Sequence, residues 1–478
     1  MTSDADRRAA RPNILFIFPD QWRFDCLSAL GHPVVETPNL DQLAHEGTLF
    51  TSAYTPAPTC IPARAALATG MSPSTCGRLG YRDGVPWPYD TFMQRLRDGG
   101  YHTMCAGKTH FWPARARLGF EELQLYEMLY QDMEHPSDYH VWLRRQVGDL
   151  VRDGGEELDS NACLAAPWTH DENLHPSSWT VTAAIELLER RDPTRPFFMQ
   201  LGFHRPHPPY DPPLAWFERF GDCELPPVPV GDWAEEFAVP VKRIDPDRGV
   251  LPPRVLDRSR RAYYAQMAYI DFQIGRMVRY LKGRRLLDST WVVFCSDHGE
   301  QLGDHHLYRK TTPFEGSAHV PLIVKPPQGS GLPTGTRISA VTTLQDLAAT
   351  FLDLGQADAP EGLEGRSLVP HLRTEAPSWR EFIHGEHTPG WQFVTDGKEK
   401  LVWRSTDDRR WFFDLEEDPS ELRNLIGDPA YAERVTLWEQ RLVGVLAQRP
   451  QDGLTDGTSL AGGHSVPAVR PWLQELGE

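Results

Sequence analysis

Cys60 begins a stretch whose residue types could stabilise an anion. The segment Cys60-Ile-Pro-Ala-Arg64 is followed by a run of small residues that ends at Gly70. Proline is tolerated in the first turn of a helix and glycine suits its end, so the pattern predicts a short helix with Cys60 at its amino terminus. Backbone N–H groups and the helix dipole would then face the Cys60 side chain. Arg64 lies one helical turn further on and could reach the same point.

Three apolar runs predict the strands of a central sheet. Residues 13–18, 196–201 and 291–295 form largely continuous apolar stretches, the pattern of strands that are buried on both faces. Helical patterns over about 178–191 and 260–287 precede the second and third runs. Helices that alternate with buried strands indicate an α/β sheet with helices on both faces.

Polar residues just beyond these runs are the first candidates for chemistry, because ligands of such sheets bind at the carboxyl ends of the strands. They are Asp20, the segment 204–207, and Asp297 with His298. Two carboxylates and one imidazole make an oxygen-rich set, which suits a hard divalent ion better than a structural zinc.

The carboxyl-terminal part of the chain predicts a second, smaller unit. A helical stretch at 344–354 is followed by a proline- and glycine-bearing run at 355–377, and a further helix is expected near 431–447. The expected fold class is α/β, with a large mixed central sheet and helices on both faces in a catalytic domain at residues 1–360. A smaller α+β domain with a short antiparallel sheet is expected at residues 361–478.

The sequence also predicts the structure of three further parts of the chain. The strands of the small sheet are expected at 392–395, 400–404 and 410–414. Residues 211–257 are rich in proline and acidic side chains, so we expect a long surface excursion there. The tail after Gln451 is predicted to be loosely ordered.

Composition excludes some classes of protein. The chain has 478 residues and a net charge of −17, which argues against a nucleic-acid binder because phosphate contacts need a dense basic surface. The apolar stretch 14–18 is too short for a signal peptide or a membrane span. Seven scattered cysteines without a Cys-x-x-Cys pair favour a reducing compartment. We therefore expect a cytoplasmic protein without a membrane partner, and homo-oligomer formation stays open.

Several ordered motifs resemble those of the type I sulfatases, the formylglycine-dependent family of the alkaline phosphatase superfamily. The Cys-x-Pro-x-Arg pattern at Cys60 resembles the segment in which those enzymes convert the cysteine to formylglycine. The other matching motifs are Arg11 to Gln21, Thr37-Pro-Asn-Leu-Asp41, Gly107-Lys-Thr-His110, Arg205-Pro-His-Pro208, Ser296-Asp-His-Gly-Glu300 with Lys310, and Phe413 to Pro419 with Asn424. The chain departs from the family where Ala63 replaces a common serine, Gln21 a frequent aspartate and His298 a frequent asparagine.

The resemblance implies a metal site and a maturation partner. Asp20, Asp297 and His298 would be metal ligands, and the formylglycine made from Cys60 would complete the shell. One divalent cation is expected, with Ca²⁺ as the first choice and Mn²⁺ or Mg²⁺ as alternatives. A formylglycine-generating enzyme would act on the chain during maturation.

The resemblance also implies roles for side chains around the formylglycine. The implied catalytic residues are Cys60, Arg64, Lys108, His110, His207 and Lys310. Lys108 would stabilise the anionic oxygen of the formylglycine hydrate, and His110 would take a proton from its second hydroxyl. In an extended segment these two side chains would point to the same side. His207 and Lys310 would hold sulfate oxygens and assist the leaving group.

The expected function is hydrolysis of a small sulfate ester to an alcohol and inorganic sulfate. The alternative is a phosphonate monoester or phosphodiester hydrolase that uses the same formylglycine, although such relatives tend to carry tyrosine and threonine in place of Lys108 and His110. A hypothesis from a different functional class is a binding protein that keeps the fold with an unconverted Cys60.

The leaving alcohol is not specified by these motifs. Residues 107–111 resemble the choline-sulfatase-type enzymes, and the fifteen tryptophans could form an aromatic cage for a cation. His175 and His204 are expected near the pocket, and Asp83 stands where some relatives have a substrate-contacting asparagine.

Overall fold

The three predicted apolar runs lie side by side in the centre of an eight-stranded sheet. In the computed structural model, which describes residues 11–128, 136–148, 158–373 and 378–475, strand β1 (Asn13–Ile17) pairs in parallel with both β6 (Phe197–Gly202) and β7 (Thr290–Cys295). The strand order across the sheet is β5-β4-β6-β1-β7-β8-β2-β9. The outer strands are β4 (His102–Gly107), β5 (Glu122–Leu125), β8 (Leu322–Lys325), β2 (Thr48–Phe50) and β9 (Thr336–Ile338).

The sheet is mixed, as the sequence predicts. Strands β4, β5 and β6 continue the parallel arrangement, whereas β8 runs antiparallel to both β7 and β2. The carboxyl ends of β4, β6, β1 and β7 therefore meet at one edge, and the residues that follow those strands converge there.

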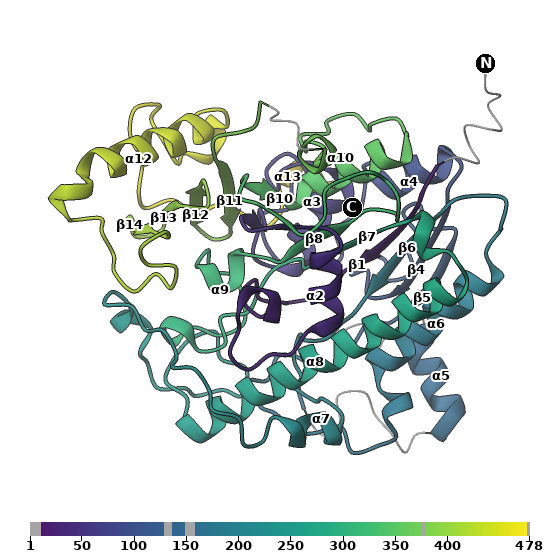
Figure 1. Cartoon of the computed structure of the whole chain (residues 1–478). Helices are drawn as coiled ribbons and strands as arrows, with labels where there is room; N and C mark the ends of the chain where they lie inside the picture. The colour runs from purple at the N-terminus through teal and green to yellow at the C-terminus, as the bar shows by residue number, and fades with distance from the viewer. Residues whose placement is uncertain (1–10, 129–135, 149–157, 374–377, 476–478) are drawn as a thin grey trace.

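Helices cover both faces of this sheet, because alternate residues of β1 point to opposite sides (Figure 1). Leu15 and Ile17 pack into one cluster with Ile270, whereas Ile14 and Phe16 pack into another with Phe351. The first face carries α2 (Pro38–His45), α6 (Pro176–Arg190) and α8 (Pro253–Gly283). The second face carries α3 (Cys60–Thr69), α4 (Phe92–Asp98) and α10 (Leu344–Gly355).

The prediction for the helix before β7 is right in kind but wrong at its ends. Helix α8 begins at Pro253, seven residues before the expected start, and ends at Gly283. A proline at the first helical position costs no hydrogen bond, which explains the early start. The segment expected as a surface excursion therefore ends before residue 253. It contains the short helix α7 (Leu214–Arg219). The buried side chain of Phe237 anchors the segment to the rest of the fold.

A four-stranded antiparallel sheet forms the carboxyl-terminal part of the fold, at the upper left of Figure 1. Strands β12 (Trp391–Thr395), β13 (Glu399–Arg404) and β14 (Arg409–Asp414) and helix α12 (Ala432–Leu446) are those that the sequence predicts. The edge strand β11 (Ile383–His387) is missing from the prediction, because its sequence Ile-His-Gly-Glu-His lacks an apolar alternation.

The two faces of this small sheet have different partners. One face packs on α12 through Trp403 and Trp438. The other packs through Phe393 on Tyr54, at the end of the short strand β3, and on Phe314. The division of the chain at residue 360 stays a prediction. The remaining elements are β3 (Ala53–Tyr54), α5 (Asp138–Val147), α9 (Glu315–Ala318), β10 (Thr342–Thr343), α11 (Val369–Leu372) and α13 (Pro471–Glu475).

The prediction of a loosely ordered tail is wrong for the described residues up to 475. Backbone N–H groups of Leu79 and Gly80 donate to the Ala468 carbonyl at 2.8 and 3.0 Å. Arg470 pairs with Asp452, with 2.8 Å between Nη2 and Oδ2. Apolar side chains of the tail are buried against the segment around residue 85, and that burial outweighs the polar character of the local sequence.

None of the helices in the described ranges is long and apolar enough to cross a lipid bilayer.

Leu473 of the tail is fully buried against Val85 and Val469. Shortening its side chain should therefore lower the stability of the protein measurably. Leu473→Ala should lower the free energy of unfolding by about 2–3 kcal/mol, because it leaves a cavity. Leu437→Ala, at a half-exposed position of α12, is the control and should cost about 0.5 kcal/mol or less. Guanidinium unfolding followed by tryptophan fluorescence measures both, and equal effects of the two variants would mean that the tail does not pack.

Candidate active site

Helix α3 places Cys60 in its first turn, as predicted from the proline and glycine positions. Every residue from Cys60 to Thr69 is buried, so this short helix is a core element and not a surface turn. Gly70 ends it in the left-handed conformation, with φ +70°. A side chain at that position would clash with Leu363, so glycine is needed both for the turn and for the packing.

Four potential metal ligands converge on Cys60 at the sheet edge. They are Asp20, Cys60, Asp297 and His298, whose ligand atoms all lie within 4.8 Å of one another. Cys60 Sγ lies 3.2 Å from His298 Nε2 and 3.7 Å from Asp20 Oδ1. Asp20 follows β1 and the other pair follows β7, so adjacent parallel strands deliver the cluster. Two carboxylates, an imidazole and the residue at position 60 fit a divalent cation with oxygen preference.

Buried cations balance the two carboxylates. Arg64 Nε donates to Asp297 Oδ2 at 2.8 Å, and its Nη2 donates to Asp20 Oδ2 at 3.1 Å. Lys108 Nζ lies 2.7 Å from the same Asp20 oxygen. Burial raises the pKa of Asp20, but Lys108, Lys310 and the other nearby cations outweigh it and hold that pKa well below its usual range. Arg64 thus reaches the carboxylates beside Cys60.

The thiol of Cys60 is protonated in this environment. Burial, with a contribution from Asp20, raises its pKa to about 11, and Lys310 and Lys108 only partly oppose this. A thiolate is the nucleophilic form of cysteine, so the unmodified side chain is a poor nucleophile here.

Lys310 and Gln21 connect Cys60 to a third buried carboxylate, Glu300. Its Nζ lies 3.0 Å from Cys60 Sγ and donates to Gln21 Oε1 at 2.8 Å. The Gln21 amide nitrogen donates to Glu300, whose other oxygen accepts from the backbone N–H of Leu302 at 2.8 Å. In the sequence, Glu300 is only the last residue of the motif that begins at Ser296, and no function could be predicted for it. A carboxylate that follows a buried strand by five residues is a signal that could have drawn attention to it.

Lys108 and His110 are both buried at the site, but the segment that carries them is not extended. His110 has φ +61°, so the extended segment in which the two side chains would point to the same side does not form. The cause is Glu127, whose Oε1 accepts from the backbone N–H of Thr109 at 2.8 Å and also from that of His110. Glu127 is fully buried, and that burial raises its pKa against the opposing effect of Lys108. No local pattern in the sequence points to this residue.

The loop after β6 brings His204 and His207 together, with 4.9 Å between their ring centroids. Burial lowers the pKa of both rings well below the usual range, and nearby lysines lower it further, so both are neutral. His207 Nδ1 lies 2.8 Å from the Pro208 carbonyl oxygen, which leaves Nε2 for other contacts. Arg205 anchors the loop through two contacts with Asp211, at 2.7 and 2.8 Å.

The remaining histidine and the acidic candidate lie outside this cluster. His175 caps α6, because its Nδ1 accepts from the backbone N–H of Ser177 at 3.2 Å. Asp83 accepts from the Tyr81 hydroxyl at 3.1 Å, and the Tyr81 ring lies 5.9 Å from that of His110. The exposed loop that carries Asp83 therefore approaches His110.

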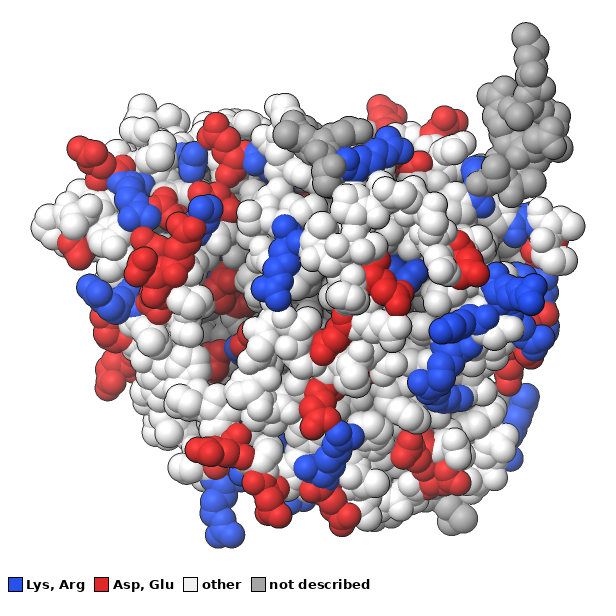
Figure 2. Space-filling model, in the orientation of Figure 1, with Lys and Arg blue, Asp and Glu red and all other residues white. Residues whose placement is uncertain are grey.

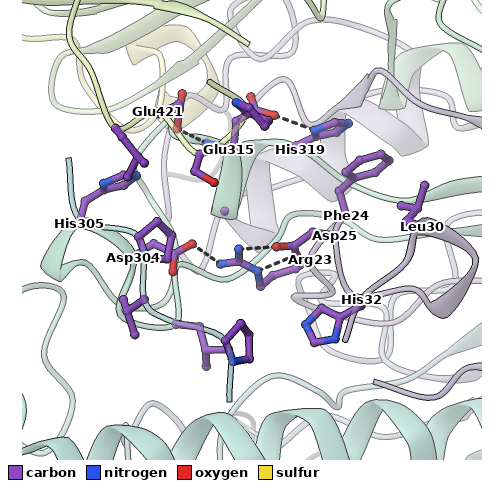
Figure 3. Close-up of a pocket in the computed structure, with 18 of the residues that line it drawn as sticks. Arg23, Phe24, Asp25, Leu30, His32, Asp304, His305, Glu315, His319 and Glu421 are labelled. Atoms are coloured by element: carbon purple, nitrogen blue, oxygen red, sulfur yellow. Dashed lines mark hydrogen bonds and ion pairs between the residues drawn. The ribbon is translucent and has the colours of Figure 1, made fainter. Parts of the chain in front are cut away.

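A separate open cavity of about 980 Å³ does not contain Cys60. Figure 3 shows Arg23 between Asp25 and Asp304, and Glu315 beside His319. These charged groups pair with one another. Acidic and basic side chains are interspersed over the face shown in Figure 2. The converging groups at Cys60, and not the size of the cavity, define the candidate site.

Comparisons with known proteins show the family to which this chain belongs. Residues 12–357 match the sulfatase family, and residues 303–448 match the carboxyl-terminal family of N-sulphoglucosamine sulphohydrolase. The chain belongs to the sulfatase family, and it is a sulfuric ester hydrolase.

Individual relatives include two sulfatases and one phosphonate monoester hydrolase. The chain is 39% identical to an arylsulfatase of Clostridium perfringens, over 96% of this chain and 99% of the relative. It is 30% identical to a choline-sulfatase of Rhizobium meliloti, over 88% of this chain and 83% of the relative. The crystal structure of a phosphonate monoester hydrolase of Agrobacterium radiobacter is similar with a TM-score of 0.78 and 28% identity, and covers 94% of this chain and 99% of that one.

The buried charge balance predicts a large effect of removing Arg64. Arg64→Ala should lower the free energy of unfolding of the metal-free protein by about 3–5 kcal/mol, because it leaves Asp20 and Asp297 buried with less compensation. Arg219→Ala, which removes a half-exposed pair with Glu36, should cost about 1 kcal/mol or less. Denaturant titration of both variants checks the difference, and similar losses would contradict the charge-balance argument.

Proposed function

We propose that this sulfatase cleaves a small sulfate ester with a formylglycine that a maturing enzyme makes from Cys60. The single observation that carries the proposal is the position of Cys60 at the start of α3, with Lys310 Nζ 3.0 Å from its sulfur and the carboxylate cluster beside it. Its raised pKa argues against catalysis by the thiol itself. An aldehyde at this position would be hydrated to a geminal diol.

The diol explains how one residue can accept and release sulfate. One hydroxyl attacks sulfur and expels the alcohol, which leaves a covalent sulfated hemiacetal. Loss of the proton from the second hydroxyl then collapses the hemiacetal and expels sulfate, so no water has to attack the crowded sulfur. We propose His110 as the base that takes this proton, because its ring is buried at the site and its lowered pKa keeps it neutral.

The surrounding cations hold the negative charge. Lys108 is fully buried and Lys310 contacts position 60, so both can stabilise sulfate oxygens during transfer. Of the two residues implied by the family resemblance, Lys310 would donate a proton to the leaving alcohol. His207 would contact the sulfate oxygens or the leaving group without donating a proton, because its neutral ring places Nδ1–H against the Pro208 carbonyl oxygen and leaves Nε2 unprotonated. Arg64 keeps the carboxylates oriented and adds positive charge at the amino terminus of α3.

The donor set fits one divalent cation, with Ca²⁺ as the first choice and Mn²⁺ or Mg²⁺ as alternatives. Asp20, Asp297, His298 and the formylglycine oxygen at position 60 would hold it. Lys310 Nζ contacts both the amide oxygen of Gln21 and the sulfur of Cys60. That amide oxygen is therefore an uncharged atom near position 60 that could serve as a further ligand of the cation. The bound cation would supply Lewis acidity that lowers the pKa of the hydrate.

Hydrolysis of phosphonate monoesters or phosphodiesters is the second candidate. The similarity to the Agrobacterium hydrolase, and 29% identity to a multifunctional alkaline phosphatase superfamily protein of Trinickia caryophylli, favour it. Lys108 and His110 argue for sulfate, because such hydrolases tend to have tyrosine and threonine there. We rank sulfate ester cleavage first, with some activity on phosphorus esters expected.

Replacement of Cys60 separates the diol mechanism from simple nucleophilic attack. Cys60→Ala should abolish turnover. Cys60→Ser should transfer sulfate once and remain sulfated, because a plain alcohol cannot collapse as a hemiacetal. Intact-protein mass spectrometry after incubation with 4-nitrophenyl sulfate measures the trapped group, and its controls are confirmed formylglycine in the wild type and equal metal content. Continuous turnover by the serine variant would contradict the mechanism.

The Lys108 and His110 pair predicts the preference between sulfur and phosphorus esters. With formylglycine occupancy confirmed, wild-type kcat/KM should be higher for 4-nitrophenyl sulfate than for 4-nitrophenyl phenylphosphonate, which has the same leaving group. The double variant Lys108→Tyr, His110→Thr should shift that ratio toward the phosphonate by about 100-fold, because one transition-state donor is lost. A wild-type enzyme that strongly prefers the phosphonate would put the second candidate first.

A further inference from the structure

The end of strand β11 is clamped between two segments that lead into the candidate site. The backbone N–H of Glu386 donates to the Pro56 carbonyl at 2.9 Å, four residues before Cys60. The backbone N–H of Thr388 donates to the Leu79 carbonyl at 3.1 Å. A side chain at Gly80 would collide with Thr388, so the two segments touch there. The residue between these two anchors, His387, therefore lies at the junction of the small sheet and the Cys60 site.

The strand register decides which way the His387 side chain points. His387 pairs with Trp391 and Gly385 with Phe393, and both aromatic partners belong to the face that packs on Tyr54. The neighbouring residues face the other way, where Glu386 pairs with Arg449 at 2.7 Å. His387 is therefore directed toward the larger sheet, on the side where Tyr54 and Phe393 pack.

The imidazole of His387 is almost completely buried. His387 is 6% exposed, and its Nε2 has no hydrogen-bond partner among the residues that the structure describes. A backbone hydrogen bond to Thr388 engages the ring, and since Nε2 is unpartnered we assign that bond to Nδ1–H. Nε2 is then an acceptor. A buried polar atom without a partner is costly, so its retention beside a binding site indicates a ligand contact.

We infer that His387 is a specificity-determining residue, whose Nε2 accepts a hydrogen bond from a hydroxyl or N–H group on the alcohol half of the bound ester. The inference rests on the proposed function and narrows its substrate class to sulfate esters whose alcohol carries a further hydrogen-bond donor. Burial lowers the pKa of His387 to about 4, which keeps the ring neutral and the acceptor available at neutral pH. The sulfate half is held by the cations around Cys60, so recognition is divided between the two sheets.

The test compares two aryl sulfates that differ by one hydroxyl, 2-hydroxy-5-nitrophenyl sulfate and 3-nitrophenyl sulfate. The measured quantity is the ratio of their kcat/KM values in enzyme with confirmed formylglycine. His387→Ala should lower this ratio roughly tenfold relative to the wild type, the loss expected for one hydrogen bond to a neutral group. His387→Gln, which keeps a side-chain acceptor, should recover part of the ratio.

The matched control is His384→Ala, which alters the same strand on its opposite face, where His384 contacts Gln392 at 2.8 Å. It should leave the ratio at the wild-type value. Thermal midpoints of all variants separate loss of folding from loss of recognition, because unfolding lowers both kcat/KM values together. A wild-type ratio in His387→Ala would overturn the inference. Absence of turnover of both esters by the matured wild type would instead overturn the proposed function, and with it the inference.

Discussion

The arrangement of the site depends on balancing two carboxylates that have no access to water. Asp20 and Asp297 are both fully buried, and an unpaired buried charge costs several kcal/mol. Arg64 contacts both of them, and Lys108 contacts one. The four residues follow or belong to β1, β7, α3 and β4. The order of the central strands and the position of α3 must therefore bring these elements to one point before the charges can be tolerated.

This charge balance sets the protonation of the surrounding groups. Burial lowers the pKa of His110, His204 and His207, and the nearby lysines lower it further, so these rings are neutral among cations. Lys108 keeps its proton, because Asp20 and the other acidic groups nearby together outweigh the effect of burial and raise its pKa. A site with fixed cations and neutral bases suits an anionic substrate that must lose a proton from the attacking group.

Contacts outside the ligand set hold the catalytic side chains in position. Glu127 accepts hydrogen bonds from the backbone N–H groups of Thr109 and His110. Glu300 accepts one from the side-chain amide of Gln21, whose oxygen accepts one from Lys310. Both carboxylates are buried, so their positions are constrained by packing as well as by hydrogen bonds. The orientation of the lysines and histidines is thus set before a substrate binds, which is what electrostatic preorganisation requires.

Local patterns alone determined the central strands, the helix at Cys60 and the gathering of Asp20, Asp297 and His298 at one sheet edge, because strand burial and helix ends leave signals within a few residues. The catalytic roles of these residues stay predictions. Only the tertiary structure decided the turn at His110, the strand β11 and the ordered tail. Each of these depends on partners distant in the chain, such as Glu127, Pro56 and Leu79, whose contacts leave no periodicity in the sequence. The fold also directs His387, a residue without any local signal, toward the larger sheet.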